Sequence, residues 1–400
     1  MESVCIIGLG YVGLPLAELC LKKGYKVYGI EVDSSKAERI RQKFPGIILN
    51  EPNAVSNSDI AIICVPTPVD HNKKPDLSCV ISASNEVARG LHKGMLVVME
   101  STVNPCVTEE DVQPILEAAG LKAGIDFDIA HCPERINPGD PKWHVGNIPR
   151  VIGATTKEGC KRAKAFYENI LDAPVKEMSS IKAAEAVKIV ENSFRDVNIA
   201  FVNELAKSFT KFGIDITEVI EGAKTKPFSF LAHYPGCGVG GHCISVDPYY
   251  LIEKANTLGF DHKLLKLARE INNSMPFHTV DLIVNALNEA GKSVKGSKIG
   301  IMGLAYKGGV EDLRESPALE IIEELRKRKA NLLIHEPYVC HLSNATAEEA
   351  INSTDIVVLL TSHPEFKNMD YSKAKIVVDG RNFLDKEVIS RQTTYVGIGR

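Results

Sequence analysis

The sequence predicts an α/β protein in which two doubly wound domains are joined by a helical central domain with one long bridging helix. Three observations predict this fold. Residues 1–176 alternate short apolar runs with helical patterns, residues 177–290 are almost entirely helical in pattern, and the alternation returns over residues 291–400. A chain of 400 residues has the length of two or three domains.

The apolar runs of the first region have the length and composition of buried strands. They are rich in valine and isoleucine and are bounded by turn residues, and they read SVCIIGLG, KVYGIEV, IAIICVP, MLVVMES and FDIAHCP. Strands that alternate with helices form parallel sheets with right-handed crossovers. We therefore expect a parallel, doubly wound sheet.

One unusually long helix is predicted in the central region. From about Ser180 to Phe212 the chain contains neither proline nor glycine, and Gly213 follows as a natural C-terminal cap. We expect this helix to bridge domains and to pack against a partner helix, which a second subunit could supply. The last region has five more strand-like runs, KIGIMGLAY, NLLIHEP, DIVVLLTS, KIVVDG and TTYVGIG.

The composition is that of an ordinary globular protein. Its net charge of −4 and the lack of a long basic run argue against nucleic acid as a partner. The N-terminus has no basic leader pattern, and no apolar stretch has the length of a membrane span. Ten irregularly spaced cysteines fit a reducing compartment. We expect a cytoplasmic protein without a membrane partner.

A glycine-rich segment follows the first expected strand. In VCIIGLGYVG, Gly8, Gly10 and Gly13 have the G-x-G-x-x-G spacing of a dinucleotide-binding turn, and a helical pattern follows. The glycines permit a tight turn, the approach of a pyrophosphate, and close packing of helix on strand, and the helix N-terminus offers N–H groups to the phosphates. The alternative is a turn that requires glycine but binds nothing.

An acidic residue near the end of the next strand indicates which nucleotide would bind. Glu31 lies where a carboxylate can accept hydrogen bonds from the adenosine ribose and would repel a 2′-phosphate. NAD is therefore favoured over NADP in a Rossmann-like domain. Asp33 is a second candidate for this acidic residue.

The loop PGCGVGGHCISVDP, residues 235–248, contains two cysteines that allow several interpretations. The possible zinc ligands His233, Cys237, His242 and Cys243 include no C-x-x-C pair, and adjacent His242 and Cys243 chelate one tetrahedral ion poorly. We expect no metal site. Either cysteine could instead be an ordinary buried thiol, which is the expectation for Cys237.

Cys243 also has the setting of a nucleophile. Gly240 and Gly241 precede it and allow close backbone access, and Asp247 follows four residues later. A cysteine attacks as thiolate, so a nearby cation would activate it. Lys188 can supply that charge if it points inward, as its apolar neighbours indicate, although most helix lysines are solvated.

Lys188 and Asn192 are four residues apart on one face of the long helix. An inward lysine can hold a developing oxyanion or help to take a proton. A nucleophilic cysteine beside NAD indicates aldehyde oxidation, because an aldehyde has no transferable hydride until it forms a hemiacetal-like adduct. A thiohemiacetal on Cys243 can release that hydride and leave a thioester, which water hydrolyses.

Six motifs then resemble, in order over nearly the whole chain, those of the UDP-glucose/UDP-N-acetylmannosamine dehydrogenase family. They are GLGYVGLPLA, ESTVNP, CPERINPG, EAVKIVEN, PGCGVGGHCISVDPYYL and GLAYKGGVEDLRESPALEII. The resemblance implies an enzyme that oxidises the C6 alcohol of a UDP-sugar to a uronic acid with two NAD⁺ at one site. It also implies a homodimer, or a higher homo-oligomer, whose core is the long helix.

The resemblance implies catalytic roles as well. Cys243 would be the nucleophile, Lys188 and Asp247 would flank a water that helps to deprotonate the 6-hydroxyl, and Asn192 would hold oxyanions together with Lys188. In the first domain, Glu134 would serve in thioester hydrolysis, and Thr102 would lie close to the reacting carbon.

Two further groups of residues are expected to bind the cofactor and the substrate. The expected NAD-binding residues are Gly8, Gly10, Tyr11, Val12, Gly13, Glu31, Lys36, Thr67, Thr102 and Arg314, the last from the C-terminal domain. The expected UDP-sugar-binding residues are Arg135, Lys188, Asn192, Tyr234, Gly240, Tyr306, Lys307 and Arg381.

One departure from the UDP-glucose branch bears on the substrate. Those enzymes carry a second glutamate four residues after the first, where PERINPG has Pro138. The motif PER-x-x-PG, KPF at 226–228 and the cysteine loop resemble the UDP-N-acetylhexosamine branch, and most closely UDP-N-acetylglucosamine 6-dehydrogenases, whose products would feed surface polysaccharide or glycan synthesis. UDP-N-acetylmannosamine, UDP-N-acetylgalactosamine and UDP-glucose stay alternatives, because one contact can separate epimers.

Two more remote functions are also compatible with parts of the sequence. A two-electron dehydrogenase of a small β-hydroxyacid shares the glycine motif and a Lys-x-x-x-Asn pair, but it requires neither Cys243 nor a second α/β domain. An NAD-binding redox sensor would use Cys237 and Cys243 as a switchable pair, and it leaves Lys188, Glu134 and Asp247 without a role.

Overall fold

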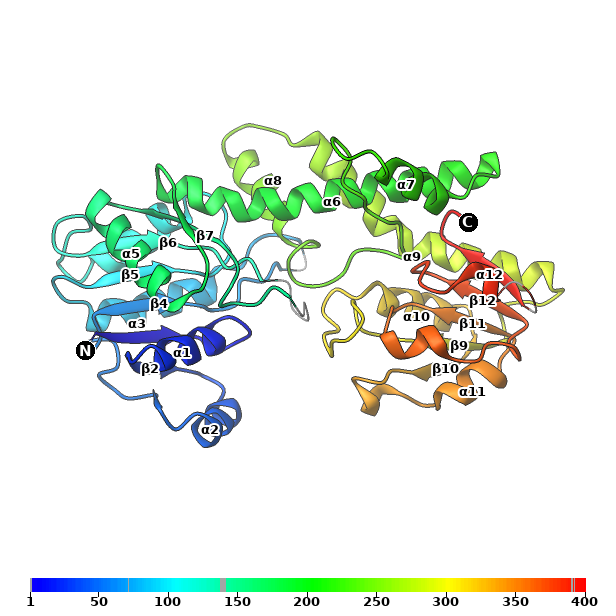
Figure 1. Ribbon diagram of the computed structural model, residues 1–400, viewed down its shortest axis with the longest axis horizontal. Helices are drawn as coiled ribbons and strands as arrows, with labels where there is room; N and C mark the ends of the chain where they lie inside the picture. The colour runs from blue at the N-terminus through cyan, green and yellow to red at the C-terminus, as the bar shows by residue number, and fades with distance from the viewer. Residues whose placement is uncertain (1, 71, 137–141, 390, 392) are drawn as a thin grey trace. The chain divides into compact units, whose positions relative to one another are not determined.

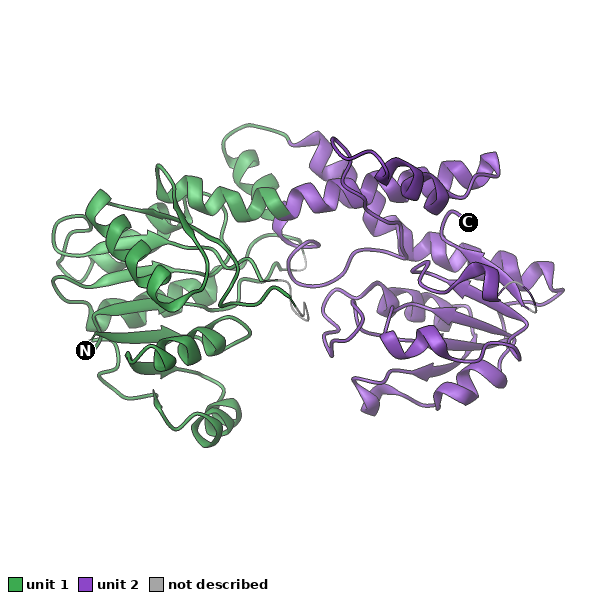
Figure 2. Ribbon diagram, viewed as in Figure 1, with its two compact units in different colours: residues 1–191, 249–261 green, residues 192–248, 262–400 purple. Residues whose placement is uncertain are grey.

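The computed structural model describes residues 2–70, 72–136, 142–389, 391 and 393–400, and it confirms the predicted fold class. Two sheets, each with helices on both faces, account for most of the chain (Figure 1). The chain forms two compact units, residues 1–191 with 249–261, and residues 192–248 with 262–400 (Figure 2). The predicted domain boundaries at 1–176, 177–290 and 291–400 stay a prediction.

The first unit is built on an eight-stranded sheet with the order β3-β2-β1-β4-β5-β6-β7-β8. Its strands are β1 (Ser3–Ile7), β2 (Lys26–Ile30), β3 (Ile47–Leu49), β4 (Ile60–Ile63), β5 (Leu96–Met99), β6 (Asp128–His131), β7 (Arg150–Ala154) and β8 (Val175–Glu177). The sheet departs from the expected parallel arrangement at one pair, because β6 and β7 are antiparallel. The sequence patterns also miss β3, β7 and β8, of which β3 and β8 have only three residues each.

Helices cover both faces of this sheet. One layer contains α1 (Gly13–Lys22), α2 (Ser34–Lys43) and α5 (Lys157–Ile170), and the other contains α3 (Ser78–Gly90), the single π-helical turn η1 (Thr108–Val112) and α4 (Gln113–Glu117). Successive residues of β1 enter opposite layers, since Val4 and Ile6 pack in one and Cys5 and Ile7 in the other. Strands buried on both faces are continuous apolar runs, and for this reason the sequence predicts them well.

The long helix lies where the sequence predicts it. It is α6 (Ile181–Phe212), 32 residues long, and Gly213 ends it with a left-handed φ of 71°. The other central helices are α7 (Ile216–Lys224), α8 (Asp247–Thr257) and α9 (Lys263–Glu289). In the second unit α6, α7 and α9 share a core that contains Val202, Ile216 and Met275. Within the described residues, no helix has both the length and the apolar character that crossing a membrane requires.

The second unit contains a five-stranded, wholly parallel sheet with the order β10-β9-β11-β12-β13. Its strands are β9 (Lys298–Met302), β10 (Asn331–His335), β11 (Ile356–Leu359), β12 (Ile376–Asp379) and β13 (Thr394–Gly397). Helices α9 and α10 (Pro317–Lys327) cover one face, and α11 (Ala347–Asn352) and the 3-10 turn η3 (Pro364–Asn368) cover the other. The remaining elements are the 3-10 turn η2 (Cys340–Leu342) and α12 (Lys386–Ile389).

Each sheet has one topological switch point. The strand order reverses between β1 and β4 in the first sheet and between β9 and β11 in the second. In open α/β sheets, ligands bind beyond the carboxyl ends of the strands at such a point. The fold therefore favours one nucleotide site in each unit, at the loops that follow these strands.

Candidate active site

The glycine loop of the first unit fits a dinucleotide. Gly8 has a left-handed φ of 90°, and a Cβ on Gly13 would lie 2.0 Å from the carbonyl oxygen of Gly8. A Cβ on Gly10 would meet nothing within 4 Å, so that side of the loop is open. Among the described residues, no side chain caps α1 at Val12, and the first turn contains no acidic residue. The N-terminus of α1 can therefore offer its N–H groups to a pyrophosphate.

The structure distinguishes the two candidate acidic residues near this loop. Glu31 is 8% exposed, accepts from the Leu9 N–H at 3.3 Å, and forms an ion pair of 2.7 Å with Lys36. Asp33 instead caps α2, since its side chain accepts from the N–H groups of Ser35 and Lys36. Glu31 is thus the carboxylate beside the glycine loop, and Lys36 lies next to it.

Two predicted threonines follow neighbouring strands of the same sheet. Thr67 comes after β4 and is buried, and its carbonyl accepts from the Tyr250 hydroxyl at 2.5 Å. Thr102 comes after β5 and is half-buried. Tyr11, in the glycine loop, is exposed. Tyr11, Thr67 and Thr102 therefore lie on loops at the carboxyl ends of strands, whereas the predicted Lys36 lies on α2.

Glu134, which follows β6, is held by three hydrogen bonds. One oxygen accepts from the N–H groups of Arg135 and Ile136, both at 2.6 Å, and the other accepts from the guanidinium of Arg150. Arg150 is fully buried on β7. Arg135, a predicted substrate-binding residue, forms an ion pair with Glu191 on α6.

A second buried carboxyl shares this arginine. Glu100, directly after β5, lies 3.9 Å from Arg150 and accepts from the Tyr167 hydroxyl at 2.6 Å. Burial raises the pKa of Glu100 to about 7, Arg150 acts against that shift, and the charge of Glu134 adds to it. The sequence does not predict the contacts of Glu100 with Arg150 and Tyr167, because these partners are 50 and 67 residues away and no motif spacing connects them.

In the second unit, the cysteine loop is fixed to the carboxyl ends of the sheet strands. The N–H of Cys237 donates to the Gly380 carbonyl at 2.7 Å, and that of Gly241 donates to the Arg314 carbonyl at 2.9 Å. Arg381, just after β12, donates to the carbonyls of Gly238, Leu360 and Tyr306 at 3.1, 2.8 and 3.4 Å. On the helical side, the Gly236 N–H donates to Asn203 of α6 at 3.0 Å.

Two glycines let this loop approach the loop after β9. A Cβ on Gly240 would lie 2.5 Å from the Glu315 carbonyl oxygen and 2.7 Å from the Cβ of Tyr306. Gly241 has a φ of 84°, and its Cβ would lie 2.8 Å from the Tyr306 ring. The glycines that the sequence analysis links to the nucleophile therefore pack on a predicted substrate-binding tyrosine.

Cys243 lies four residues before the start of α8 at Asp247. The Asp247 N–H donates to the Cys243 carbonyl at 2.8 Å, and the Asp247 carboxylate accepts from the Asn192 amide at 2.5 Å. Cys243 is half-buried, whereas Cys237 is fully buried and its pKa is raised by that burial. The structure thus brings Cys243, Asp247 and Asn192 together and keeps Cys237 in the core.

Three other predicted catalytic residues belong to the first unit. Lys188 is 7% exposed on α6, and Glu134 and Thr102 follow β6 and β5. Arg314 forms an ion pair with Asp312, whose pKa burial tends to raise but the contacts with Arg314 lower overall. Two further predicted substrate-binding residues in the second unit are Tyr234, hydrogen-bonded to Glu221, and half-buried Lys307. Pro138 lies outside the described residues.

Replacing Gly241 tests the contact between the cysteine loop and Tyr306. Gly241→Ala should lower kcat/KM by about 10²-fold. A Cβ 2.8 Å from the Tyr306 ring would displace the loop that carries Cys243, the predicted nucleophile, and a misplacement of about 1 Å can cost this much. The control is Gly213→Ala, where φ is 71° but the space is open. It should cost about 1 kcal/mol in unfolding free energy and leave kcat/KM nearly unchanged. Equal kinetic losses in both variants would contradict the packing account.

Glu100 makes stability depend on pH. Because its pKa is raised to about 7 in the folded protein, the protonated folded form is favoured, and this contribution is full below the unfolded pKa of about 4.5 and is lost as pH rises through 7. As pH rises from 5 to 8, the Tm of the wild type should therefore fall steadily relative to the Tm of Glu100→Gln. Differential scanning calorimetry of both proteins measures it, and a constant difference would refute the assignment.

Comparisons with known proteins agree with this geometry. Residues 47–171, 182–274 and 300–386 match the NAD-binding, central and UDP-binding domain models of the UDP-glucose/GDP-mannose dehydrogenase family. Residues 3–86 also match a model described as NADP oxidoreductase coenzyme F420-dependent. The match to the NAD-binding domain confirms the predicted NAD cofactor, and the match to the UDP-binding domain supports a UDP-sugar as substrate.

Relatives match over almost the whole chain. A UDP-N-acetyl-D-glucosamine 6-dehydrogenase of Pseudomonas aeruginosa is 36% identical over 92% of both chains. A UDP-N-acetyl-D-mannosamine dehydrogenase of Pyrococcus horikoshii is 34% identical over 99% of both. The structure of a UDP-D-ManNAc dehydrogenase from Pyrococcus horikoshii superposes with a TM-score of 0.93, covering 100% of this chain and 99% of the other. The chain therefore belongs to the UDP-glucose/GDP-mannose dehydrogenase family and is, as its motifs predict, an NAD-dependent UDP-sugar dehydrogenase.

Proposed function

We propose that the protein oxidises the C6 alcohol of a UDP-N-acetylhexosamine to the uronic acid in two NAD⁺-dependent steps, with UDP-N-acetylglucosamine as the preferred sugar. The observation that carries the proposal is the cluster at the start of α8. There, Cys243 adjoins Asp247, which is hydrogen-bonded to Asn192, on a loop fixed to the strand ends of the UDP-binding domain. A dehydrogenase that removes only two electrons has no use for this cysteine.

The names of the relatives support an N-acetylhexosamine. They include a glucosamine-type 6-dehydrogenase at 36% identity and mannosamine-type enzymes at about the same level. These values do not separate the epimers, so UDP-N-acetylmannosamine is the second candidate, followed by UDP-N-acetylgalactosamine and UDP-glucose. The motif PER-x-x-PG and the cysteine loop are the sequence features that favour the glucosamine type.

The first half of the proposed reaction removes the 6-hydroxyl proton and a hydride. The glycine loop and Glu31 would hold NAD⁺, which would supply the hydride acceptor for each of the two oxidations. Asp247 and Lys188 flank the water that receives the hydroxyl proton, and Asn192 holds Asp247 in place by its hydrogen bond of 2.5 Å. The product of this half is an aldehyde at C6.

The second half takes place on the cysteine. The Cys243 thiolate forms a C–S bond to the aldehyde, and the resulting oxyanion is held by Lys188 and Asn192. Loss of the second hydride gives a thioester, and water then cleaves the C–S bond to release the uronic acid and the thiol. Glu134 accepts the proton of that water, and Thr102 contacts the reacting carbon. One alcohol, one water and two NAD⁺ would thus yield one carboxylate, two NADH and three protons.

Counting the NADH formed tests this proposal. With limiting UDP-N-acetylglucosamine and excess NAD⁺, two NADH should form per sugar, because the alcohol loses four electrons. Cys243→Ser should reduce uronic acid formation by a factor on the order of 10³ or more. The exposed Cys79→Ser serves as control. One NADH per sugar would mean that oxidation stops at the aldehyde and would contradict the proposal. Faster turnover of another UDP-sugar would change the identity of the substrate and leave the proposed four-electron oxidation intact.

We place this reaction in the cytoplasm. Within the described residues none of the ten cysteines forms a disulfide, and several are exposed or half-buried. Thiols in such positions stay reduced in a cytosolic environment. A nucleophilic Cys243 requires the same condition.

We also propose a homodimer in which α6 packs against its counterpart. Phe194 and Phe201 are seven residues apart and therefore lie on one face of α6, and their side chains are 49% and 54% exposed. Large exposed aromatic side chains in one stripe are typical of interfaces between subunits.

A charge on this face should separate the subunits. Phe201→Glu is expected to lower the mass measured by light scattering from two chains to one, because burying an unpaired carboxylate costs several kcal/mol. Ile125→Glu, at a site 84% exposed in the first unit, should leave the mass unchanged. A wild-type protein with the mass of one chain would refute the dimer.

A further inference from the structure

The second unit repeats the nucleotide-binding motif of the first in altered form. GLGYVG at residues 8–13 and GLAYKG at residues 303–308 each follow the first strand of a sheet. Gly8 and Gly303 share a left-handed φ, 90° and 91°. Each motif also has a glutamate after the neighbouring strand, Glu31 after β2 and Glu336 after β10.

The two glutamates have different partners. Glu31 accepts from one amide of its glycine loop, at 3.3 Å, and pairs with Lys36. Glu336 is fully buried and accepts from two amides of its loop, those of Leu304 at 2.7 Å and Ala305 at 3.1 Å. Leu9 and Leu304 each follow the first glycine of their motif, so the two carboxylates take corresponding places beside their loops, and Glu336 binds one loop amide more.

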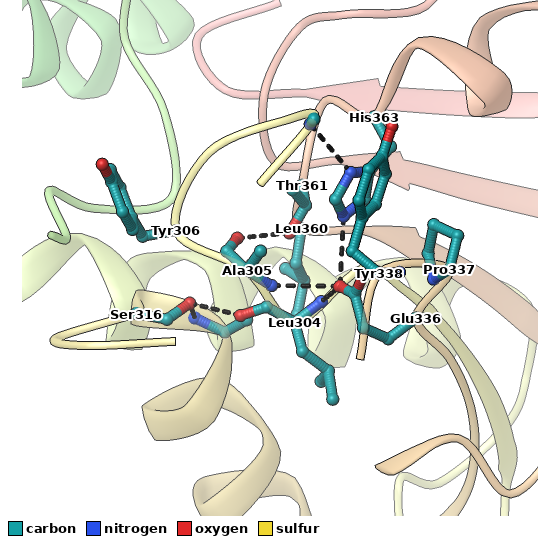
Figure 3. Close-up of polar contacts among 12 residues, drawn as sticks. Leu304, Ala305, Tyr306, Ser316, Glu336, Pro337, Tyr338, Leu360, Thr361 and His363 are labelled. Atoms are coloured by element: carbon teal, nitrogen blue, oxygen red, sulfur yellow. Dashed lines mark hydrogen bonds and ion pairs between the residues drawn. The ribbon is translucent and has the colours of Figure 1, made fainter. Parts of the chain in front are cut away.

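All four backbone polar groups of Leu304 and Ala305 bond to side chains (Figure 3). Both N–H groups donate to Glu336, the Leu304 carbonyl accepts from Ser316 at 2.6 Å, and the Ala305 carbonyl accepts from Thr361 at 2.6 Å. Unlike GLGYVG, this motif does not run directly into a helix, since α10 begins only at Pro317, nine residues after Gly308. These backbone groups are already used within the protein, and a bound pyrophosphate would have to compete for them.

His363 completes the anion's surroundings. Its Nε2 lies 3.1 Å from Glu336, and its Nδ1 accepts from the Gly309 N–H at 3.1 Å, which assigns the proton to Nε2. The His363 ring is fully buried and stacks on Tyr338 with ring centroids 4.8 Å apart. Burial tends to raise the pKa of Glu336, but the hydrogen bonds from His363 and the backbone outweigh it and lower the pKa to about 2. The group is a carboxylate at neutral pH.

We propose that Glu336, supported by His363 and Thr361, is an internal anion that holds the loop of residues 304–309 in position for the UDP-sugar. The proposal rests on the proposed function, because that loop carries Tyr306 and Lys307. Glu336 and its partners are positioning residues, which act on substrate through the loop.

The same loop connects the anion to the cysteine. In Figure 3 the Tyr306 ring points away from Glu336, and Gly241 of the cysteine loop packs against this ring. Glu336 thus holds the backbone from one side while Tyr306 contacts the cysteine loop on the other. A more mobile loop of residues 304–309 should therefore weaken the binding of the UDP-sugar more than it slows the chemical steps.

The test compares the affinities for UDP and for NAD⁺ by calorimetry. Glu336→Gln keeps the shape but presents an NH₂ group to donors, so UDP affinity should fall about tenfold or more while NAD⁺ affinity stays within about twofold. Glu31→Gln is the matched control in the first unit and should weaken NAD⁺ and spare UDP. In turnover, Glu336→Gln should raise the KM for UDP-sugar more than it lowers kcat.

A second pair of variants changes the loop less, so that a loss of UDP binding can be separated from misfolding of the domain. Thr361→Val removes the bond to the Ala305 carbonyl and should weaken UDP binding, whereas Thr361→Ser retains the hydroxyl and should restore it. The inference is overturned if wild type binds UDP and both Glu336→Gln and Thr361→Val bind it equally well. If wild type binds NAD⁺ but not UDP, the proposed function fails and the inference fails with it.

Discussion

The guanidinium of Arg381 connects the parts of the candidate site in the second unit. It donates to three carbonyls that belong to the end of β11, to the loop after β9 and to the cysteine loop. Three different nitrogens of a planar fork reach the three segments, whereas the donors of a lysine all radiate from one nitrogen. Arg381 therefore connects the loop that contains Cys243, the proposed nucleophile, to the sheet of the UDP-binding domain and to the loop that contains Tyr306.

Both units use buried carboxylates, but for different purposes. Glu134 and Glu100 share Arg150, and burial leaves Glu100 with a pKa near neutrality. Glu336 is bound by three N–H groups and a histidine, and its pKa is held at about 2. The number of donors decides the difference, because each hydrogen bond to the ionised form offsets part of the desolvation cost.

The sequence predicts most of the fold because buried parallel strands and a helix free of glycine and proline leave strong periodic signals. It does not predict short strands such as β3, or β7, whose pairing with β6 runs antiparallel. The glycine loop and the pair of Cys243 and Asp247 can be predicted because their residues are close in sequence, whereas Asn192, 55 residues before Asp247, is joined to that pair only through the family resemblance. Arg150, Glu100 and His363 cannot, since their partners are distant. Glu336 does have a signal, the likeness of GLAYKG to GLGYVG, followed by an acidic residue after the next strand.

The central claim is that Cys243 carries the substrate as a thioester which a water near Glu134 cleaves. Trapping that intermediate tests it most directly. The Glu134→Gln variant would be incubated with excess NAD⁺ and UDP-N-acetylglucosamine, quenched in acid and mapped by mass spectrometry, with UDP-N-acetylmannosamine in parallel. The account predicts a uronyl adduct on the peptide that contains Cys243, released by hydroxylamine. NADH formation without an adduct on Cys243, or with one on another residue, would contradict it.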